Sequence, residues 1–231
     1  SKNENKKDFL DNSNSVIFKG LKGDVIPRTN GQFRCIKEIN KNDIVFLTGP
    51  SGTGKTFLSI ISAVILLQNN EIDKIILCRP AVEAGESLGF LPGDLKEKID
   101  PYLTPLYESL EKILPRSKLR ELLSKNIIEI IPLAYMRGRT LENCFLILDE
   151  AQNTTKIQMK MFLTRIGIGS KAVITGDITQ VDLKKESDSG LTKVLDILKN
   201  IKGIGFVNMD TNDIVRHILV KDIIKAYDVK K

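Results

Sequence analysis

Short apolar segments alternate with longer amphipathic segments along most of the chain. The apolar segments are rich in Ile, Leu, Val and Phe, and their apolar residues are consecutive, which is typical of β-strands covered on both faces. Alternating β and α segments predict an α/β fold in three layers, a mainly parallel sheet flanked by helices. The expected strands are residues 43–49, 74–80, 127–132, 143–149, 171–177 and 203–209.

The amphipathic segments predict the helices. They are expected at residues 54–69, 94–124, 154–165, 189–200 and 211–227. Pro101, Pro105 and Pro115 are expected to break the second helix, because proline removes a helical hydrogen bond. The stretch from about 83–126 is long for one crossover between strands, so we interpret it as a small helical insertion at one edge of the sheet.

Composition places the chain among soluble globular proteins, with 42% hydrophobic and 28% charged residues in 231. Residues 1–14 are polar and expected to be a disordered tail, followed by a single domain over residues 15–231. Three distant cysteines and one histidine argue against a disulfide frame or a zinc site. No secretory signal or bilayer-length apolar segment is present, so we expect a cytoplasmic protein without membrane association.

The sequence GPSGTGKT follows the first expected strand and opens the first expected helix. It matches the phosphate-loop pattern G-x-x-x-x-G-K-[ST], in which backbone N–H groups and the helix dipole surround a phosphate. Lys55 is expected to reach the β- and γ-phosphates of a nucleotide, and the Thr56 hydroxyl to ligate Mg²⁺. The predicted nucleotide-binding residues are Gly49, Pro50, Ser51, Gly52, Thr53, Gly54, Lys55 and Thr56.

Two adjacent carboxylates, Asp149 and Glu150, end the strongest apolar segment of the chain. A phosphate-loop enzyme needs a second strand that ends in Asp to hold the Mg²⁺ shell, and Asp149 fits this position. A carboxylate beside the γ-phosphate can activate a water for attack, which makes Glu150 the candidate catalytic base. The pair favours an NTP hydrolase with a RecA-like fold. Gln152 and Asn153 are expected to relay the state of the γ-phosphate.

The next expected strand ends in the sequence ITGDITQ, residues 174–180. In RecA-like sheets this strand lies between the phosphate-loop strand and the acidic strand, so its carboxyl end faces the γ-phosphate. We therefore expect Gln180 or Thr175 to sense the γ-phosphate. Asp177 is expected to support the metal shell or a coupling loop.

These motifs together resemble known proteins. DEAQ with a downstream GDxxQ is similar to motifs II and III of superfamily 1 helicases. The chain from about Ser15 onward strongly resembles the PhoH-like ATPases, through GPSGTGKT, RPAVEAGESLGFLPGDLKEKIDPYLTPLYESL, AYMRGRT, ILDEAQNTTKIQMKMFLTRIGIGSKAVITGDITQVDL and DIVRHILVKDIIKAYD. The resemblance implies a RecA-like P-loop NTPase fold, ATP and Mg²⁺ as cofactors, ATP hydrolysis and RNA as a partner. Some members carry nuclease or RNA-binding modules, whereas this chain is expected to be the ATPase core alone.

Further roles follow from the resemblance. Gln32 precedes the phosphate loop, as does the adenine-reading glutamine of superfamily 1 helicases, and its amide can pair with adenine; the alternative is a solvated loop residue. Arg216 and Arg165 are candidates for an arginine that stabilises charge on the γ-phosphate. The alternatives are a snorkelling side chain for Arg216 and a helix C-cap charge for Arg165. An arginine supplied by a neighbouring subunit would predict a homo-oligomer, such as a hexameric ring.

Three more arginines are candidates for nucleic-acid contacts. Arg79 ends the second expected strand, at a position that contacts the nucleic-acid backbone in superfamily 1 helicases. Arg137 and Arg139 flank a glycine before the acidic strand, where phosphate binding and a plain surface role are equally compatible with the sequence. The net charge of +6 permits binding of a polyanion without establishing it.

The leading functional hypothesis is a Mg²⁺-dependent ATPase that acts on RNA as a helicase-like remodeller. A P-loop small-molecule kinase is the first alternative, although it leaves Glu150 and the GDITQ segment unexplained. A nucleotide-switched binding module is the second, and it would retain the phosphate loop without needing Glu150.

Overall fold

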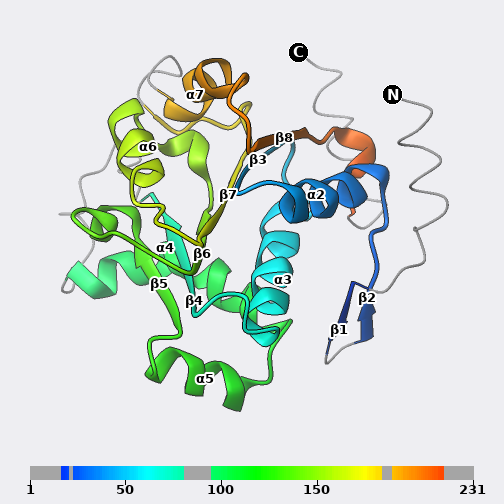
Figure 1. Ribbon diagram of the computed structural model, residues 1–231, viewed down its shortest axis with the longest axis vertical. Helices are drawn as coiled ribbons and strands as arrows, with labels where there is room; N and C mark the ends of the chain where they lie inside the picture. The colour runs from blue at the N-terminus through cyan, green and yellow to red at the C-terminus, as the bar shows by residue number, and fades with distance from the viewer. Residues whose placement is uncertain (1–16, 21–22, 81–94, 184–188, 216–231) are drawn as a thin grey trace.

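A six-stranded parallel sheet forms the centre of the protein in the computed structural model, which describes residues 17–20, 23–80, 95–183 and 189–215 (Figure 1). The spatial order of the strands is β5-β4-β6-β7-β3-β8, and every neighbouring pair is parallel. The strands are β3 (Ile44–Thr48), β4 (Lys74–Arg79), β5 (Ile128–Pro132), β6 (Cys144–Leu148), β7 (Lys171–Gly176) and β8 (Ile204–Asn208). Each of the six predicted strands is present, with ends within one residue of the prediction.

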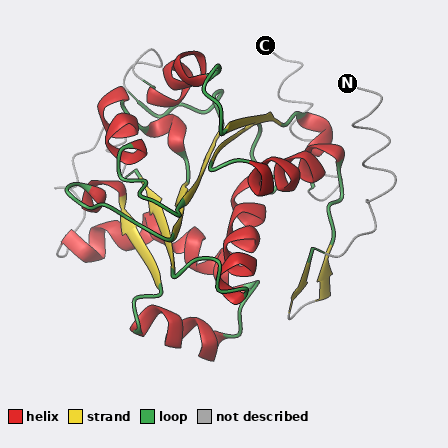
Figure 2. Cartoon of the chain, in the orientation of Figure 1, coloured by secondary structure: helices red, strands yellow, loops and turns green. Residues whose placement is uncertain are grey.

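Helices cover both faces of the sheet, and α2 and α3 lie on one side of it with α6 and α7 on the other (Figures 1 and 2). The helices are α2 (Asn30–Lys41), α3 (Lys55–Gln68), α4 (Leu95–Glu111), α5 (Arg116–Ser124), α6 (Lys156–Leu163) and α7 (Gly190–Leu198). Short 3₁₀ helices are η2 (Leu133–Met136), η3 (Ala151–Asn153) and η5 (Thr211–Asp213), and β1 (Phe18–Gly20) pairs with β2 (Gly23–Val25) as a separate hairpin. The predicted α/β fold in three layers is therefore confirmed.

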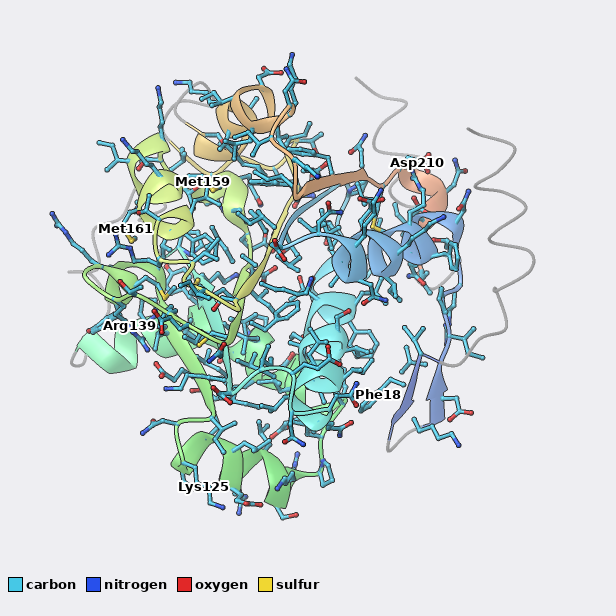
Figure 3. All side chains as sticks on the ribbon, in the orientation of Figure 1. Phe18, Lys125, Arg139, Met159, Met161 and Asp210 are labelled. Carbon is cyan, nitrogen blue, oxygen red and sulfur yellow. The ribbon has the colours of Figure 1, made fainter. Side chains whose placement is uncertain are left out.

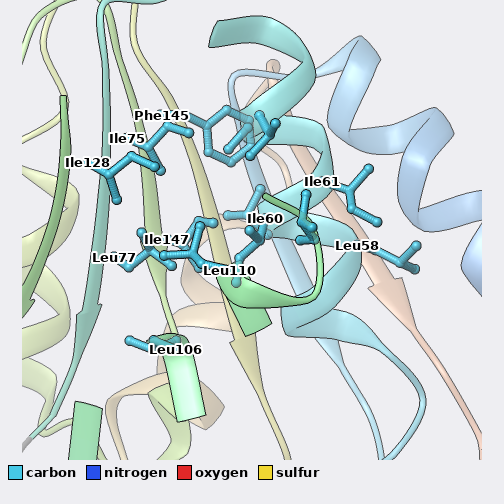
Figure 4. Close-up of a cluster of buried hydrophobic side chains, with 14 of the residues drawn as sticks. Leu58, Ile60, Ile61, Ile75, Leu77, Leu106, Leu110, Ile128, Phe145 and Ile147 are labelled. Atoms are coloured by element: carbon cyan, nitrogen blue, oxygen red, sulfur yellow. The ribbon is translucent and has the colours of Figure 1, made fainter. Parts of the chain in front are cut away.

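Successive residues of each central strand pack into two different cores, because strand side chains alternate between the two faces. Phe145 and Ile147 of β6 lie in the core under α3 and α4, as Figure 4 shows, and α5 contributes to the same core. Leu146 and Leu148 lie in the core under α6, α7 and η2. All four side chains are buried, which explains why the sequence of this strand is apolar at every position.

The position of β7 decides the geometry of the site. It pairs with β3 on one side and with β6 on the other, so it separates the strand of the phosphate loop from the strand that precedes Asp149. This arrangement is the one predicted for a RecA-like sheet. It brings three strand ends to one edge of the sheet, where ligands bind in open α/β folds.

Helix α4 differs from its prediction, because it contains Pro101 and Pro105 instead of breaking at them. Each proline costs a helix about 3 kcal/mol. Leu103, Leu106 and Leu110 follow helical spacing and are all buried in the core, and this burial offsets the cost. Pro115 does separate α4 from α5, as predicted, since it is the N-cap residue of α5.

Two elements at the start of the described chain were not predicted. Helix α2 begins at a Thr29 N-cap, whose hydroxyl accepts a hydrogen bond from the backbone N–H of Gln32, and it buries Cys35 and Ile39. The hairpin β1–β2 places Phe18 against the core beside α3 (Figure 3). Of the helix predicted at 211–227, η5 is described, and residues 216–231 lie outside the described part of the chain, as do residues 1–14 of the predicted tail.

The described helices include none that is both long and apolar enough to cross a membrane.

Glu129 is a partly buried ion-pair partner on the edge strand β5. Its carboxylate accepts hydrogen bonds from Lys74 at 2.7 Å and from Arg139 at 2.8 and 3.1 Å. Burial raises the pKa of Glu129, but the hydrogen bonds from Arg139 and Lys74 outweigh it, so the pKa lies below its ordinary value of 4.5. This contribution to stability is present above pH 4.5 and is lost as the pH falls through the lowered pKa.

Glu129→Gln should therefore lower the free energy of unfolding by about 1–2 kcal/mol near pH 7, since it leaves two cations without their carboxylate. Thermal unfolding measured at about pH 7 and about pH 3 should show the difference from wild type shrinking in acid. The exposed Glu71→Gln serves as the control and should change neither curve. A difference of equal size at both pH values would contradict the assignment.

Candidate active site

A cavity lies at the carboxyl edge of the sheet, between the phosphate loop and the ends of β6 and β7. Helix α4 contributes Ser109 to its wall, which the sequence did not indicate. The full lining is Ser51, Gly52, Gly54, Lys55, Thr56, Phe57, Ser109, Asp149, Glu150, Gly176, Asp177 and Gln180. The structure thus brings the predicted loop, the acidic pair and Gln180 together around one space.

The phosphate loop needs glycine at two positions for different reasons. Gly49 has φ +138°, and a Cβ there would collide with the backbone carbonyl of Met209 after β8. Gly54, the N-cap of α3, has φ +91°, in the left-handed region that side chains disfavour. The backbone N–H of Val215 also donates to the carbonyl of Gly52 at 3.0 Å, so the segment after β8 fixes the loop from outside.

Lys55 lies inside the loop, where its Nζ donates to the carbonyls of Gly49 at 2.7 Å and Pro50 at 2.8 Å. Burial lowers the pKa of Lys55 by disfavouring its charge, and the nearby Asp177, along with Glu150 and Asp149, acts in the opposite direction. A buried cation that is held by carbonyl oxygens is well placed to bind an anionic phosphate.

Asp149 joins three parts of the site. Its Oδ1 accepts hydrogen bonds from the Thr56 hydroxyl at 2.6 Å and from the Thr175 hydroxyl at 2.7 Å, and its backbone N–H donates to Cys78 at 2.9 Å. The side chain is 7% exposed. A hydroxyl and a carboxylate are hard oxygen donors, which suit Mg²⁺ when phosphate oxygens and waters complete its shell. Thr56 and Asp149 therefore fit the predicted metal ion, while Thr175 holds Asp149 in place.

Glu150 has a left-handed backbone, with φ 52° and ψ 42°. This conformation costs a residue with a Cβ on the order of 1 kcal/mol, and it turns the chain sharply after Asp149. Both carboxylate oxygens have partners. Arg79 Nη2 donates to Oε1 at 2.8 Å, and Gln152 Nε2 donates to Oε2 at 2.6 Å.

Gln152 and Asn153 connect the acidic segment to the segment after β7. The Gln152 Oε1 accepts a hydrogen bond from the backbone N–H of Asp177 at 3.0 Å. Asn153 exchanges two hydrogen bonds with Asp182, at 2.8 and 3.1 Å. Gln180 is exposed at the cavity, and its backbone N–H donates to Asp177. These contacts join the two segments, and the relay predicted for Gln152 and Asn153 stays a prediction.

Gln32 lies in the first turn of α2 and is buried against the phosphate loop. Its Nε2 donates to the Thr53 carbonyl at 3.0 Å, and its Oε1 accepts from the backbone N–H of Arg28 at 2.8 Å. It is therefore a support of the loop and not the solvated loop residue weighed as the alternative. Contact with adenine stays a prediction. After the two hydrogen bonds to Thr53 and Arg28, the side-chain amide of Gln32 retains one N–H and one oxygen lone pair with which it could pair with adenine.

Asp213 holds the start of α2, next to Gln32, from a place that the sequence did not indicate. Its Oδ1 accepts a hydrogen bond from the backbone N–H of Gly31 at 3.0 Å, and a Cβ at Gly31 would collide with it. Asp213 also closes a capping box with Asp210 in η5. The sequence signal that could have revealed this element is the D-x-x-D spacing, which is typical of a cap.

The predicted arginines lie in different parts of the structure. Arg79 contacts the acidic pair, with its Nε 3.6 Å from Asp149 Oδ2. Arg139 (labelled in Figure 3) pairs with Glu129, and Arg137 is exposed. The carbonyl of Arg165 accepts from the backbone N–H of Leu141, which precedes β6, so Arg165 lies at the amino edge of the sheet, opposite the cavity. Arg216 lies outside the described residues.

Comparison with known proteins shows the family to which the chain belongs. Residues 24–228 match the PhoH-like protein family. The PhoH-like protein of Bacillus subtilis (strain 168) is 57% identical over 213 residues, which cover 92% of this chain and 67% of that protein. This chain belongs to the PhoH-like protein family. Protein PhoH of Escherichia coli (strain K12) is 42% identical to it over 205 residues, covering 88% of this chain and 58% of that protein.

The PhoH-like chain spans 58–67% of the length of these two relatives. Its fold also resembles that of the large terminase of a thermophilic bacteriophage, with a TM-score of 0.52 and 13% identity. That match covers 84% of this chain and 49% of the terminase. The likeness shows the P-loop NTPase fold and nothing about activity.

Gln32→Ala should weaken the binding of ATP and GTP to a similar degree, because its contact with Thr53 supports the loop for any nucleotide. Loss of one buried hydrogen bond predicts about a fivefold weaker affinity. Fluorescent nucleotide titration of both ligands measures it, with the exposed Lys41→Ala on the same helix as the control. A clearly larger loss for ATP than for GTP would show that Gln32 also reads adenine.

Proposed function

We propose that this PhoH-like chain hydrolyses ATP with the help of Mg²⁺ and couples hydrolysis to RNA. The observation that carries the hydrolytic part is the position of Glu150, which borders the same cavity as Lys55 and directly follows Asp149. A nucleotide-binding switch needs only the phosphate loop and one carboxylate for the metal ion. A hydrolase also needs a base that accepts a proton from water, and a second carboxylate at the cavity can supply it.

Each residue has a distinct task in this proposal. The loop amides and Lys55 bind and orient the phosphates, and Thr56 and Asp149 hold the metal ion. Mg²⁺, when bound, neutralises charge on the β- and γ-phosphates. Glu150 accepts a proton from the attacking water, and Gln180 contacts the γ-phosphate. The hydrogen bond between Gln152 and the backbone of Asp177 transmits loss of that phosphate to the loop after β7.

RNA is the proposed macromolecular partner. The net charge of +6 and the exposed Arg137 support attraction of a polyanion, and the resemblance to PhoH-like ATPases supports RNA in particular. Conformational change at the β7 loop would remodel the bound strand.

Glu150→Gln should reduce phosphate release from ATP by about 100-fold or more, because the amide no longer accepts the proton from water. ATP affinity should stay near that of wild type, since the loop is unchanged. Phosphate release and nucleotide titration, each with and without single-stranded RNA, measure both quantities. RNA should increase the wild-type rate.

The exposed Glu71→Gln removes the same charge elsewhere and should leave the rate unchanged. Turnover of Glu150→Gln equal to that of wild type would contradict the hydrolytic role and favour a kinase or a binding module. A wild-type rate that ignores RNA would remove the RNA part of the proposal alone.

We also propose a homo-oligomer, such as a hexameric ring, in which Arg165 completes the site of a neighbouring subunit. Among the described residues that line the cavity, Lys55 is the basic one, and Arg165 lies at the opposite edge of the sheet. In this proposal Arg165 reaches the γ-phosphate of another copy of the chain, because its place at the opposite edge of the sheet keeps it away from the cavity of its own chain.

Mixing two inactive variants tests this arrangement. Glu150→Gln subunits retain Arg165, and Arg165→Ala subunits retain Glu150, so an equal mixture should recover about one quarter of the wild-type rate. Light scattering with and without nucleotide gives the mass of the assembly. A mixture that stays as inactive as its two components, or a monomer with full activity, would contradict the arrangement.

A further inference from the structure

The hydrolytic carboxylate is fully engaged by protein side chains in the structure. Arg79 holds one oxygen of Glu150 at 2.8 Å and Gln152 holds the other at 2.6 Å. The Arg79 pair is charged on both sides, and such hydrogen bonds are the stronger kind. A general base must accept a hydrogen bond from water, so the contact with Arg79 competes directly with activation of water.

Arg79 approaches the acidic pair from the side away from the phosphate loop. Asp149 contacts Thr56 of the loop helix with Oδ1, and its Oδ2 lies 3.6 Å from Arg79 Nε. Among the described residues, Glu150 lines the cavity at the phosphate loop and Arg79 does not. We therefore take the anion that competes for Arg79 to belong to a second ligand on the β4 side and not to the nucleotide.

A second contact ties Arg79 to helix α4. Its Nη1 donates to the backbone carbonyl of Tyr102 at 3.0 Å, while Nη2 contacts Glu150. The side chain is 17% exposed, so it is not sealed from solvent. Arginine suits this arrangement, because its planar fork binds a carbonyl, a carboxylate and a phosphate with the same set of donors.

We propose that Arg79 is a positioning residue that restrains Glu150 until a phosphate of a polynucleotide backbone binds the guanidinium. Binding of that phosphate releases the Glu150 oxygen to water and so couples the presence of the strand to ATP hydrolysis. The inference rests on the proposed function, and it gives the RNA dependence of that function a physical cause. Arg79 contacts no reacting atom in this scheme and acts through Glu150.

The ion pair is tested first without nucleotide or RNA. Thermal unfolding of wild type, Arg79→Gln, Glu150→Gln and the double variant forms a double-mutant cycle. We expect the melting-temperature shift of the double variant to differ by about 2–4 °C from the sum of the two single-variant shifts. One such ion pair gives a difference of this size in a chain of this length. Additive shifts would show that the pair does not form, and would overturn the proposal.

Turnover is tested next with ATP, in the presence and absence of single-stranded poly(U). The RNA-free kcat of Arg79→Gln should rise about fivefold above wild type, the population shift that one partly exposed ion pair supports, and KM for ATP should not change. Stimulation by RNA should fall toward onefold. Arg79→Lys retains the positive charge without the planar guanidinium. Its RNA-free kcat and its stimulation by RNA should lie between those of wild type and Arg79→Gln.

Arg116→Gln removes the same charge from the exposed start of α5 and should behave as wild type. An RNA-free kcat of Arg79→Gln that is unchanged or falls toward that of Glu150→Gln would overturn the restraint, because Arg79 would then be neutral or would help catalysis. Wild-type protein that shows the thermal coupling but releases no phosphate would overturn the proposed ATPase and the regulatory role together, while the ion pair itself would stand.

Discussion

The site depends on one carboxylate that is fixed from three directions. Asp149 follows β6, and its side chain accepts hydrogen bonds from Thr56 at the start of α3 and from Thr175 in β7. Because β7 pairs with both β3 and β6, this carboxylate joins the phosphate loop to the acidic strand across one intervening strand. The buried position leaves this carboxylate little freedom, so it holds Thr56, Thr175 and the neighbouring Glu150 at a constant spacing.

The fixed position of Asp149 determines what Glu150 can do. The chain turns through a left-handed residue immediately after Asp149, and the strain is sustained by two side-chain partners on opposite sides. Gln152 links Glu150 to the backbone of Asp177 just after β7, and Arg79 links it to α4. Glu150 is thus connected through one oxygen to Gln152 and the segment after β7, and through the other to Arg79 and α4.

The central strands could be predicted because both of their faces are buried, which forces consecutive apolar residues such as those of β6. Local signals failed where tertiary packing outweighs them. Pro101 and Pro105 indicate a break, yet α4 continues through both because its leucines are buried against the sheet. Helix α2 begins with Asn and Gly, which are weak helix formers, and it is stabilised by burial of Cys35 and Ile39.

The sequence by itself determined the phosphate loop, the acidic pair and the parallel sheet, because each depends on residues that are adjacent in the chain or on a repeating apolar pattern. Only the tertiary structure decided the partners of these residues. The contacts of Arg79 with Glu150, of Gln32 with Thr53 and of Asp213 with Gly31 join residues that are 71, 21 and 182 positions apart. Contacts over such separations arise from the order in which strands pair, and no local pattern in the chain records that order.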